Sequence, residues 1–457
     1  MDEISFGTDG WRATLDTFTD RRVRIVGQAV ASYLQESGAD APVAVGYDAR
    51  EHSRGFAEEL CRVLCANGFD VVLPERDAPT PVVAWTTRER DLAGALVITA
   101  SHNPPEYNGV KFLSADGAPV LPETTDAIEA RLAEPDPLPA AEHGSVHEAD
   151  LLQPYLDHAR AFVDADLEGL TVAYDAMHGS GRGVTDRLLE SAGAEVVRLR
   201  CDRDPEFGGA APEPTADHLS DLTERVRQGE ADLGIANDGD ADRIGVVTPG
   251  RGFLDPSLFF AAVYDFLLSG HDGPAVRTVS TSSVVDRVAD AHDELVYETP
   301  VGFKWVAQAM AEHDALMGGE ESGGFGVRGH VRNKDGVLLA LLAAAACAQR
   351  HLDDRVAAIE TEHGEVHQDR VSVACPDDRK EPVVDELDGA LPDRIAGTAV
   401  DRVNDVDGFK IFLADGGWLL VRPSGTEPKL RVYAEADSEG RVAELLEAGR
   451  QLVEPLV

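Results

Sequence analysis

The sequence has little lysine and a marked shortage of positive charge. Only six of its 41 basic residues are lysine, against 83 acidic residues, so the formal net charge is −42 over 457 residues. The negative electrostatic field of such a chain repels nucleic acids and anionic membranes, so neither is expected as a partner. Abundant acid with scarce lysine favours a halophilic protein adapted to concentrated salt, where self-repulsion is screened, over a merely acidic one. The six lysines are Lys111, Lys304, Lys334, Lys380, Lys410 and Lys429.

Cysteine and long apolar runs are also sparse. The five cysteines show no metal-ligand spacing, and Cys61 and Cys65 lie four residues apart in a predicted helix, which favours core packing over a disulfide. A reducing cytoplasm is therefore expected. The longest apolar run, residues 337–348, is too short to span a bilayer and predicts a buried helix. The opening residues MDE lack the pattern of a secretory signal, so none is expected.

The order of Val/Ile-rich runs and helical patterns predicts repeated βαβ units. A chain of 457 residues exceeds what one hydrophobic core usually supports. The order strand, helix, glycine and Val-Val occurs twice, beginning at residues 43 and 171, and the two predicted helices have similar lengths. A weaker copy of this order begins at residue 277. After residue 363 the pattern becomes strand-rich, which indicates an α+β domain. The expected domains span residues 1–145, 146–249, 250–365 and 366–457.

Residues 99–104, with the sequence TASHNP, directly follow the apolar run 95–98. A buried strand that ends in small polar residues presents a hydroxyl at the carboxyl edge of a sheet, where open α/β sheets bind ligands. Pro104 prevents simple continuation of the strand and biases Asn103 away from helix, so Ser101 lies on a shaped turn. A serine held there can act as a nucleophile once a cation or base activates it. An ordinary Ser/Asn/Pro turn is the alternative.

Residues 234–243, with the sequence GIANDGDADR, carry three alternating carboxylates. Asp238, Asp240 and Asp242 can converge on one hard divalent cation, for which Mg²⁺ is the first choice. An EF-hand is excluded because Arg243 and Pro249 stand where that loop needs glycine and glutamate. The other explanation is an Asx-rich turn in an acidic chain.

Two further glycine-containing loops suit a sugar and a phosphate. The loop GGEESGG at residues 318–324 offers Glu320 as an acceptor and Ser322 as a donor for sugar hydroxyls. The segment RPSGTEPK at residues 422–429 combines an arginine, two hydroxyls and backbone N–H groups around a glycine, which favours a phosphate cradle. An ordinary polar loop is the alternative for each.

Together these segments resemble the α-D-phosphohexomutase superfamily, which includes phosphoglucomutase, phosphomannomutase and phosphoglucosamine mutase. Five motifs occur in order over nearly the whole chain: FGTDGWR at 6–12, TASHNP followed by NGVK, DGDADR, GGEESGG and RPSGTEP. The resemblance implies an α/β fold of four domains, in which three similar mixed-sheet units and a C-terminal α+β domain surround a central cleft. It also implies an intramolecular phosphotransferase that interconverts hexose 1-phosphate and hexose 6-phosphate.

The resemblance further implies roles for single residues in the reaction. Ser101 would be a phosphoserine, and Mg²⁺ would be held by its phosphoryl oxygen together with Asp238, Asp240 and Asp242. Charge at the transferring phosphoryl group would be offset by Arg12 and Arg243. Proton transfer would be assisted by Lys111 and His102.

The resemblance places the substrate on two loops. Sugar hydroxyls would bind Glu320 and Ser322, and the phosphate that is not reacting would bind Arg422, Ser424, Gly425 and Thr426. Many mannose- and glucosamine-type members end the sugar loop in histidine, where this chain has Gly324 and so lacks one acid/base group. The segment TPVGFKW at residues 299–305 looks like the glucomutase form of the substrate loop, with Lys304 near the sugar phosphate. Glucose is therefore favoured over mannose and glucosamine.

The leading hypothesis is a Mg²⁺-dependent phosphoglucomutase primed by glucose 1,6-bisphosphate and acting on small-molecule sugar phosphates. Phosphomannomutase and phosphoglucosamine mutase are the alternatives within the family. A metal-dependent sugar phosphatase that uses the same serine, and a non-catalytic sugar-phosphate binder, are alternatives of other classes. The sequence leaves open whether the protein is a monomer or homodimer, whether Ser101 is phosphorylated as isolated, and whether Lys111 or His102 moves the proton.

Overall fold

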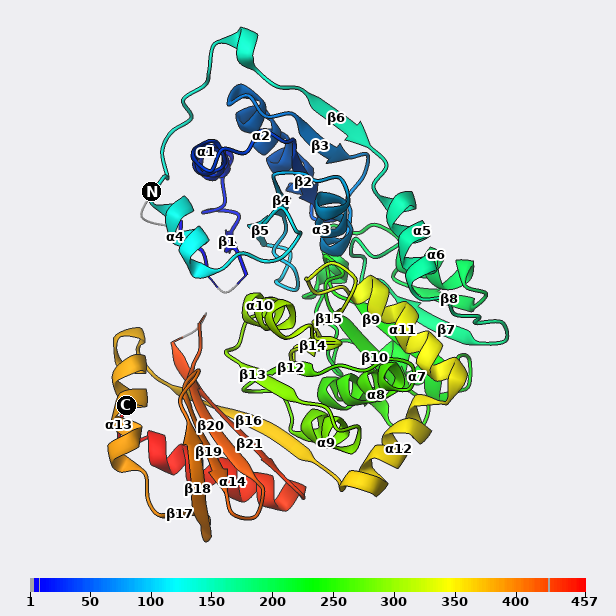
Figure 1. Cartoon of the computed structure of the whole chain (residues 1–457), viewed down its shortest axis with the longest axis vertical. Helices are drawn as coiled ribbons and strands as arrows, with labels where there is room; N and C mark the ends of the chain where they lie inside the picture. The colour runs from blue at the N-terminus through cyan, green and yellow to red at the C-terminus, as the bar shows by residue number, and fades with distance from the viewer. Residues whose placement is uncertain (1–3, 8, 426–427) are drawn as a thin grey trace.

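Four sheets follow one another along the chain, and helices pack against them (Figure 1). The computed structural model describes residues 4–7, 9–425 and 428–457, apart from the side chain of Asp388. Parallel strands adjoin antiparallel ones in each of the first three sheets, whereas the fourth sheet is antiparallel throughout. This arrangement confirms the predicted three mixed α/β units and C-terminal α+β unit, which we call units I to IV.

Unit I is built on the sheet β1-β5-β4-β2-β3-β6. In strand β2, Val43 and Val45 pack in a core with α1 and α2, whereas Ala44 between them packs on the other side with α3. Cys61 and Cys65 lie in α2 as free thiols, as predicted. The elements are β1 (Trp11–Thr14), α1 (Asp20–Glu36), β2 (Val43–Tyr47), α2 (Ser53–Ala66), β3 (Val71–Pro74), α3 (Thr80–Glu89), β4 (Gly94–Ile98), β5 (Tyr107–Leu113), α4 (Pro122–Glu129), η1 (Ala140–Glu142) and β6 (Val146–Ala149).

Unit II repeats the pattern on the smaller sheet β11-β10-β9-β7-β8. Its central strand β9 is buried along its whole length. The elements are α5 (Leu152–Phe162), β7 (Thr171–Asp175), α6 (Thr185–Ser191), β8 (Glu195–Leu199), η2 (Phe207–Gly209), α7 (Ser220–Arg227), β9 (Leu233–Asn237), β10 (Ile244–Thr248) and β11 (Gly252–Leu254).

Unit III has the sheet β13-β12-β14-β15 and the strongly apolar helix α11. The apolar run at 337–348 forms most of α11, which packs against α6 of unit II, so the prediction of a buried helix is confirmed. Among the described residues, no helix is long and apolar enough to cross a membrane. The elements are α8 (Pro256–Leu268), β12 (Ala275–Thr278), α9 (Val284–Ala291), β13 (Val296–Thr299), α10 (Phe303–His313), β14 (Met317–Gly319), β15 (Phe325–Val327), α11 (Gly336–Gln349) and α12 (Leu352–His363).

Unit IV is the antiparallel sheet β16-β21-β20-β19-β18-β17, packed against α13 and α14. It lies beside unit III at the lower left of Figure 1. The elements are β16 (His367–Ala374), η3 (Asp377–Arg379), α13 (Lys380–Ala390), β17 (Arg394–Ile395), β18 (Thr398–Asn404), β19 (Phe409–Leu413), β20 (Trp418–Pro423), β21 (Lys429–Ala436) and α14 (Glu439–Val453).

The three mixed sheets carry their polar motifs at equivalent positions. In each unit a parallel strand ends, and the chain returns as its antiparallel neighbour. The intervening loop holds TASHNP between β4 and β5, DGDADR between β9 and β10, and EESGG between β14 and β15. The repeat therefore explains why three motifs far apart in sequence all follow the carboxyl ends of buried strands.

Two edge strands lie beyond the boundaries expected after residues 145 and 249. Strand β6 pairs with β3 and so extends the sheet of unit I, and β11 pairs with β10 in unit II. The proline-rich segment and the glycine-rich turn before these strands resemble linkers. Because β6 is mostly exposed and β11 has only three residues, neither shows the apolar run of a central strand.

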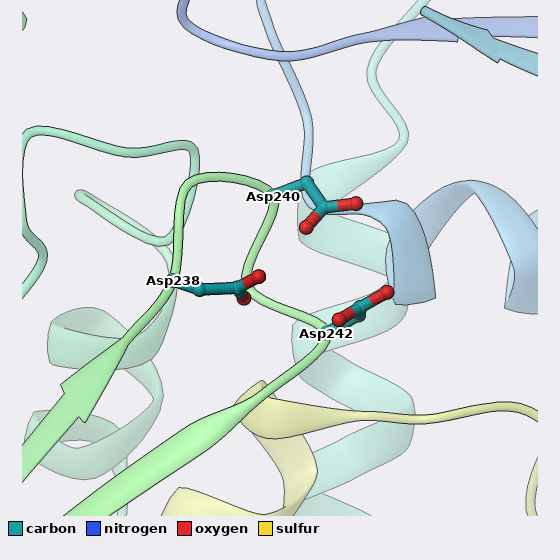
Figure 2. Close-up of side chains that lie close together, drawn as sticks. All are labelled: Asp238, Asp240 and Asp242. Carbon is teal, nitrogen blue, oxygen red and sulfur yellow. The ribbon is translucent and has the colours of Figure 1, made fainter. Parts of the chain in front are cut away.

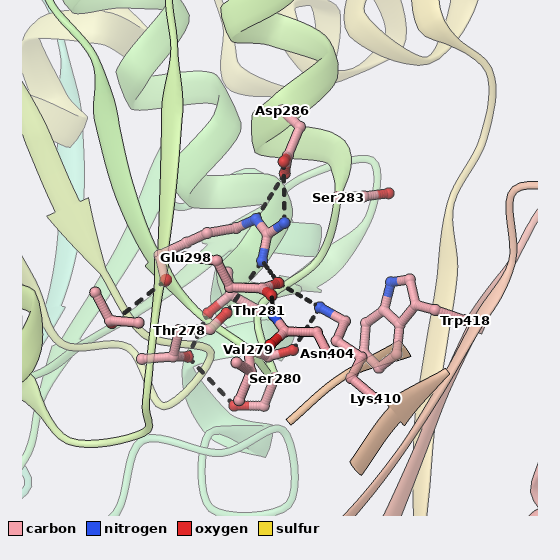
Figure 3. A network of polar contacts seen from close by, with 12 residues as sticks. Thr278, Val279, Ser280, Thr281, Ser283, Asp286, Glu298, Asn404, Lys410 and Trp418 are labelled. Carbon is pink, nitrogen blue, oxygen red and sulfur yellow. Dashed lines mark hydrogen bonds and ion pairs between the residues drawn. The ribbon is translucent and has the colours of Figure 1, made fainter. Parts of the chain in front are cut away.

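A buried polar network joins units III and IV (Figure 3). Lys410 Nζ of β19 donates to Glu298 of β13 at 2.6 Å and to the carbonyl of Val279 at 2.7 Å. The Arg277 guanidinium lies between Glu298 and Asp286. Burial lowers the pKa of Lys410 to about 8. Since buried charges need partners, this network fixes the position of β19 against β13.

Candidate active site

Ser101 lies on the loop between β4 and β5, and its side chain is buried. Its φ of 51° falls in the left-handed region, which non-glycine residues seldom adopt. The backbone N–H donates to Thr99 Oγ1 at 2.8 Å, and Oγ donates to Asp238 Oδ2 at 2.7 Å. His102 Nδ1 is 3.3 Å from the same Oγ. The shaped turn therefore holds a hydroxyl of unit I against a carboxylate of unit II.

Asp238, Asp240 and Asp242 converge on the loop between β9 and β10 (Figure 2), and each offers an oxygen within 4.8 Å of the others. Asp240 Oδ2 accepts from Thr80 Oγ1 at 2.7 Å. The Oδ1 atoms of Asp240 and Asp242 are buried and have no hydrogen-bond partner among the described residues. Orphaned carboxylate oxygens that face one another suit a hard divalent cation.

The electrostatics of this loop also favour a bound cation. Burial, followed by the charges of Asp240 and Asp242, raises the pKa of Asp238 well above its ordinary value. Three carboxylates so close together repel one another unless positive charge is supplied. The donor set is all oxygen, which Mg²⁺ prefers. The three aspartates therefore fit a magnesium ion, and Ser101 lies where a phosphoryl group could complete its ligands.

Two buried lysines supply positive charge to the same loop. Lys111 Nζ of β5 lies 2.9 Å from Asp240, 2.8 Å from Asp242 and 3.0 Å from Asp9. Lys334 Nζ, just before α11, lies 3.1 Å from Asp242 and 3.3 Å from Asp9. Burial opposes the charge on Lys111, but the carboxylates outweigh it and raise its pKa. Both lysines therefore act as fixed cations here.

Arg12 contacts Asn103 of the serine loop, Arg243 contacts Asp238, and His102 is the neighbour of Ser101 in the chain. Arg12 Nη2 of β1 is 3.0 Å from Asp9. The backbone N–H of Arg243 donates to Asp238 Oδ1 at 3.0 Å, while its buried Nε has no partner among the described residues. Burial, followed by the charges of Arg243 and Arg12, lowers the pKa of His102 well below its ordinary value, so the imidazole is neutral.

The loop between β14 and β15 contains the buried Glu320 and the exposed Ser322. Glu320 Oε1 accepts from the N–H of Gly302 at 2.9 Å, and burial raises the pKa of Glu320 to about 7. Ser322 is exposed. Lys304 is the second residue of α10, whose N-cap is Gly302, and burial lowers the pKa of Lys304.

Gly324, the position at which the family resemblance implies a histidine in many mannose- and glucosamine-type members, packs against Lys334. A Cβ at position 324 would lie 2.4 Å from Lys334 Cδ and 2.9 Å from its Cγ. The lysine stem therefore occupies the space into which a side chain at position 324 would grow. The space beside Gly324 is therefore filled by the Lys334 side chain and is not an empty cavity.

Arg422 near the end of β20 and the loop that follows this strand form a second cluster. Arg422 Nη2 is 3.0 Å from Asp407 Oδ2, whereas Arg422 Nε and Ser424 Oγ are buried with no partner in the described part of the chain. Gly425 is exposed, and Thr426 lies outside the described residues. Unsatisfied donors on one loop are what a bound phosphate would satisfy.

Apart from Lys304, Glu320 and Ser322, the predicted site residues thus fall into two groups. Ion pairs with Asp9 join Arg12 to Lys111, which also contacts Asp240 and Asp242. Contacts at hydrogen-bond distance join Ser101, His102, Asp238 and Arg243, and the cluster of three aspartates brings these two sets of residues together. The unit IV loop reaches the other units through Asp407, which accepts from the N–H of Val301 at 2.9 Å. Val301 belongs to the TPVGFKW segment at 299–305, so Asp407 connects that segment to Arg422.

Four successive domain families match the chain. They are phosphoglucomutase/phosphomannomutase α/β/α domain I over residues 3–138, domain II over 153–251, domain III over 255–362 and the C-terminal domain over 371–451. The chain belongs to the phosphoglucomutase/phosphomannomutase family. It is therefore an enzyme of the mutase type, an isomerase that transfers a phosphoryl group.

Relatives within this family carry the names of different sugars. A phosphoglucomutase/phosphomannomutase of Thermococcus kodakarensis is 32% identical over 98% of both chains. A Methanopyrus kandleri protein named "probable phosphoglucosamine mutase" is 34% identical over 96% of this chain and 95% of its own. The crystal structure of a candidate phosphomannomutase from Thermus thermophilus aligns over 99% of both chains with 32% identity and a TM-score of 0.86. The family is common to all of them, but the sugar is not.

Sequence reasoning gave no role to several residues that contact the site. Lys334 is one of only six lysines, and this scarcity was a signal that could have found it. Thr80 opens helix α3 and donates through both N and Oγ1 to Asp240, yet nothing in its local sequence points to the other unit. Arg50 contacts the Ser101 loop through its backbone carbonyls, which no side-chain pattern reveals. Lys380 Nζ holds the carbonyl of Ser424 at 2.7 Å.

Proposed function

We propose that this mutase interconverts hexose 1-phosphate and hexose 6-phosphate through a phosphorylated Ser101 and a bisphosphorylated sugar, with glucose phosphates as the preferred substrates. The observation that carries the proposal is the position of Ser101 Oγ, buried and 2.7 Å from Asp238 within the aspartate cluster. A hydroxyl at a carboxylate site that fits Mg²⁺ is suited to carry a phosphoryl group.

The residues around Ser101 suit phosphoryl transfer, which needs positioning and charge neutralisation more than covalent help. Mg²⁺, when bound, neutralises charge on the phosphoryl oxygens. Lys111 and Arg243 bring fixed cations to the same place. As the bond from phosphorus to the sugar oxygen forms, the sugar hydroxyl releases its proton and the bond to Ser101 Oγ breaks. His102, whose Nδ1 is 3.3 Å from Oγ, is the group we assign to accept the proton from the sugar hydroxyl and to return it to Ser101 Oγ as that oxygen leaves phosphorus.

The second cluster suits the phosphate that is not reacting. Among the described residues, Arg422 Nε and Ser424 Oγ are buried donors with no hydrogen-bond partner, and Gly425 and Thr426 follow them in the sequence. A bisphosphate held alternately at its two ends can turn so that either phosphate faces Ser101. Glucose 1,6-bisphosphate would then act as the activator that restores a phosphoserine lost to hydrolysis.

Recognition of the sugar itself is assigned to unit III. Glu320 would accept from sugar hydroxyls, the exposed Ser322 would donate to or accept from them, and Lys304 would meet the sugar phosphate. The preference for glucose is supported by the TPVGFKW segment and by Gly324, whose neighbouring space holds the Lys334 stem. Comparing initial rates on glucose 1-phosphate, mannose 1-phosphate and glucosamine 1-phosphate tests this preference, and equal rates would contradict it.

The phosphoserine is tested by Ser101→Ala, assayed for glucose 6-phosphate formation with Mg²⁺ and glucose 1,6-bisphosphate. We expect kcat to fall at least about 1000-fold, because the group that carries the phosphate is removed. Ser257→Ala, at a buried serine in α8, is the matched control and should keep wild-type activity. A Ser101→Ala enzyme with most of its activity would refute the mechanism. Release of inorganic phosphate equal to substrate loss would instead identify a phosphatase.

A further inference from the structure

We propose that Arg50 is a positioning residue that holds the Ser101 loop in the conformation required for phosphoryl transfer; this inference rests on the proposed function of Ser101. Arg50 follows strand β2 in unit I and is only 2% exposed. It reaches the reaction only through the backbone that carries Ser101.

All five N–H donors of the Arg50 side chain can be assigned to partners within unit I. Nε donates to Asp48 Oδ2 at 3.0 Å. The two Nη groups donate to four backbone carbonyls of the loop and of the first residue of β5: Ser101 (2.8 Å), Asn103 (2.7 Å), Pro104 (2.7 Å) and Tyr107 (3.1 Å). One planar cation therefore fixes both ends and the middle of the segment 101–107.

Asp48 anchors the guanidinium and is connected to Ser101 by a second route. Its carboxylate accepts from Ser53 Oγ at 2.5 Å and from Thr99 Oγ1 at 2.7 Å. Thr99 Oγ1 in turn accepts from the N–H of Ser101 at 2.8 Å. The amide of Ser101 is thus held through Thr99 and its carbonyl through Arg50, so both peptide groups beside its Cα are fixed.

The conformation of Ser101 explains why such a holder is needed. A serine with a φ of 51° is strained and persists only where its surroundings over-determine it. On the other side of its carbonyl lies the metal loop, since a Cβ on Gly239 would be 2.6 Å from Ser101 O. The carbonyl is confined between Arg50 and Gly239, and this confinement directs Oγ to Asp238.

Unit II also closes over the guanidinium. The ring of Phe207 lies 4.9 Å from Arg50 Cζ, in cation–π contact. Arg50 therefore touches unit I through hydrogen bonds and unit II through this ring, and it keeps the serine loop in register with the metal loop. Lysine offers three donors on a flexible stem and cannot reproduce this planar fork.

The test compares Arg50→Lys with Arg355→Lys, at a similarly buried arginine of α12 that is paired with Asp265 and lies outside this network. In Arg50→Lys we expect backbone amides of residues 101–109 to exchange hydrogen at least about tenfold faster. We also expect kcat to fall about 100-fold with KM changed less than about twofold, because a displacement of about 1 Å at the reacting group costs that much. Asp48→Asn is a milder change at the residue that anchors Arg50. It should also speed amide exchange at residues 101–109 and lower kcat, but by smaller factors than Arg50→Lys.

Wild-type exchange and kcat in a folded Arg50→Lys enzyme would overturn the proposal, as would a lower kcat with unchanged exchange in the loop. Unfolding of both Arg50→Lys and Asp48→Asn would mark Arg50 as a residue of general stability and also overturn it. Failure of the proposed function looks different: Ser101→Ala would stay active while Arg50→Lys still exchanged faster at 101–109. That result would support the clamp on the loop and refute the phosphoserine.

Discussion

Because Gly324 packs against Lys334, adding one methyl group at position 324 tests whether activity depends on the position of the lysine side chain. In Gly324→Ala the new Cβ would lie 2.4 Å from Lys334 Cδ, whereas carbon atoms pack at about 3.5–4.0 Å. The lysine stem must therefore move by about 1 Å or more. Lys334 is only 4% exposed, and its Nζ lies 3.1 Å from Asp242 and 3.3 Å from Asp9. A shift of that size breaks both ion pairs.

Two consequences follow from this displacement. Overpacking a filled site lowers the free energy of unfolding by about 1–3 kcal/mol. Loss of one preorganised donor beside the transferring group costs about 100- to 1000-fold in kcat. Because Lys111 still contacts Asp240 and Asp242, we expect the lower end, about 100-fold. The assay is kcat for glucose 1-phosphate at saturating Mg²⁺ and bisphosphate, with urea unfolding measured on the same samples.

A matched glycine and a double-mutant cycle separate the lysine from other causes. A Cβ added at Gly55 of α2 would have no atom within 4 Å, so Gly55→Ala should keep kcat and stabilise the helix by about 0.5–1 kcal/mol. In a Lys334→Ala background the stem is gone, and Gly324→Ala should then lower kcat by less than about threefold. Effects that multiply in the double variant would show that Gly324 acts independently of Lys334 and would refute the reasoning.

Two further predictions concern the metal loop and the sugar loop. Thr80→Val removes the 2.7 Å hydrogen bond to Asp240 and should weaken Mg²⁺ binding about 10- to 100-fold by calorimetric titration, whereas Thr87→Val in the same helix should leave it unchanged; equal affinities would contradict the role of Thr80. Burial raises the pKa of Glu320 from 4.5 to about 7, so the folded protein binds more protons than the unfolded one between these values and loses about 3 kcal/mol of stability as pH rises through them. Urea unfolding at pH 5 and 7.5 should show this loss in the wild type relative to Glu320→Gln, and parallel stabilities of the two would contradict it.

The motifs that follow buried strands could be placed from sequence because strand ends impose strong local constraints. Residues 95–98 lie in a buried strand that ends at Ile98, and Pro104 prevents its simple continuation, so Ser101 was expected at a sheet edge. The alternating aspartates at 238–242 follow a buried strand in the same way. What sequence could not supply is the meeting of these two loops, since the 2.7 Å contact between Ser101 and Asp238 joins residues 137 positions apart.

Groups that act through the backbone or across a unit boundary were missed for a physical reason. Arg50 recognises carbonyl groups, which every residue possesses, so no residue pattern marks its targets. The helix expected after residue 171 was predicted to match the length of the helix after residue 43, but α6 has seven residues whereas α2 has 14. The glycine-rich residues 176–184 form a loop packed on the metal loop instead. A helix does form where the sequence pattern predicts one, but it begins only at Thr185. The packing of Gly179 against Gly239 keeps the preceding residues in a loop.

Most of the few lysines in this chain are buried, and two of them lie at the aspartate cluster. Lysine is seldom buried in proteins, yet Lys111, Lys334 and Lys410 are each less than 5% exposed and Lys380 is 8% exposed. Each has carboxylate or carbonyl partners at hydrogen-bond distance, while Lys304 is the second residue of α10 and Lys429 is the first residue of β21. A lysine that faces only solvent can be lost from an acidic chain without consequence, whereas one that neutralises buried carboxylates cannot. In a chain of this composition, the few lysines that remain therefore mark the residues around which the units assemble.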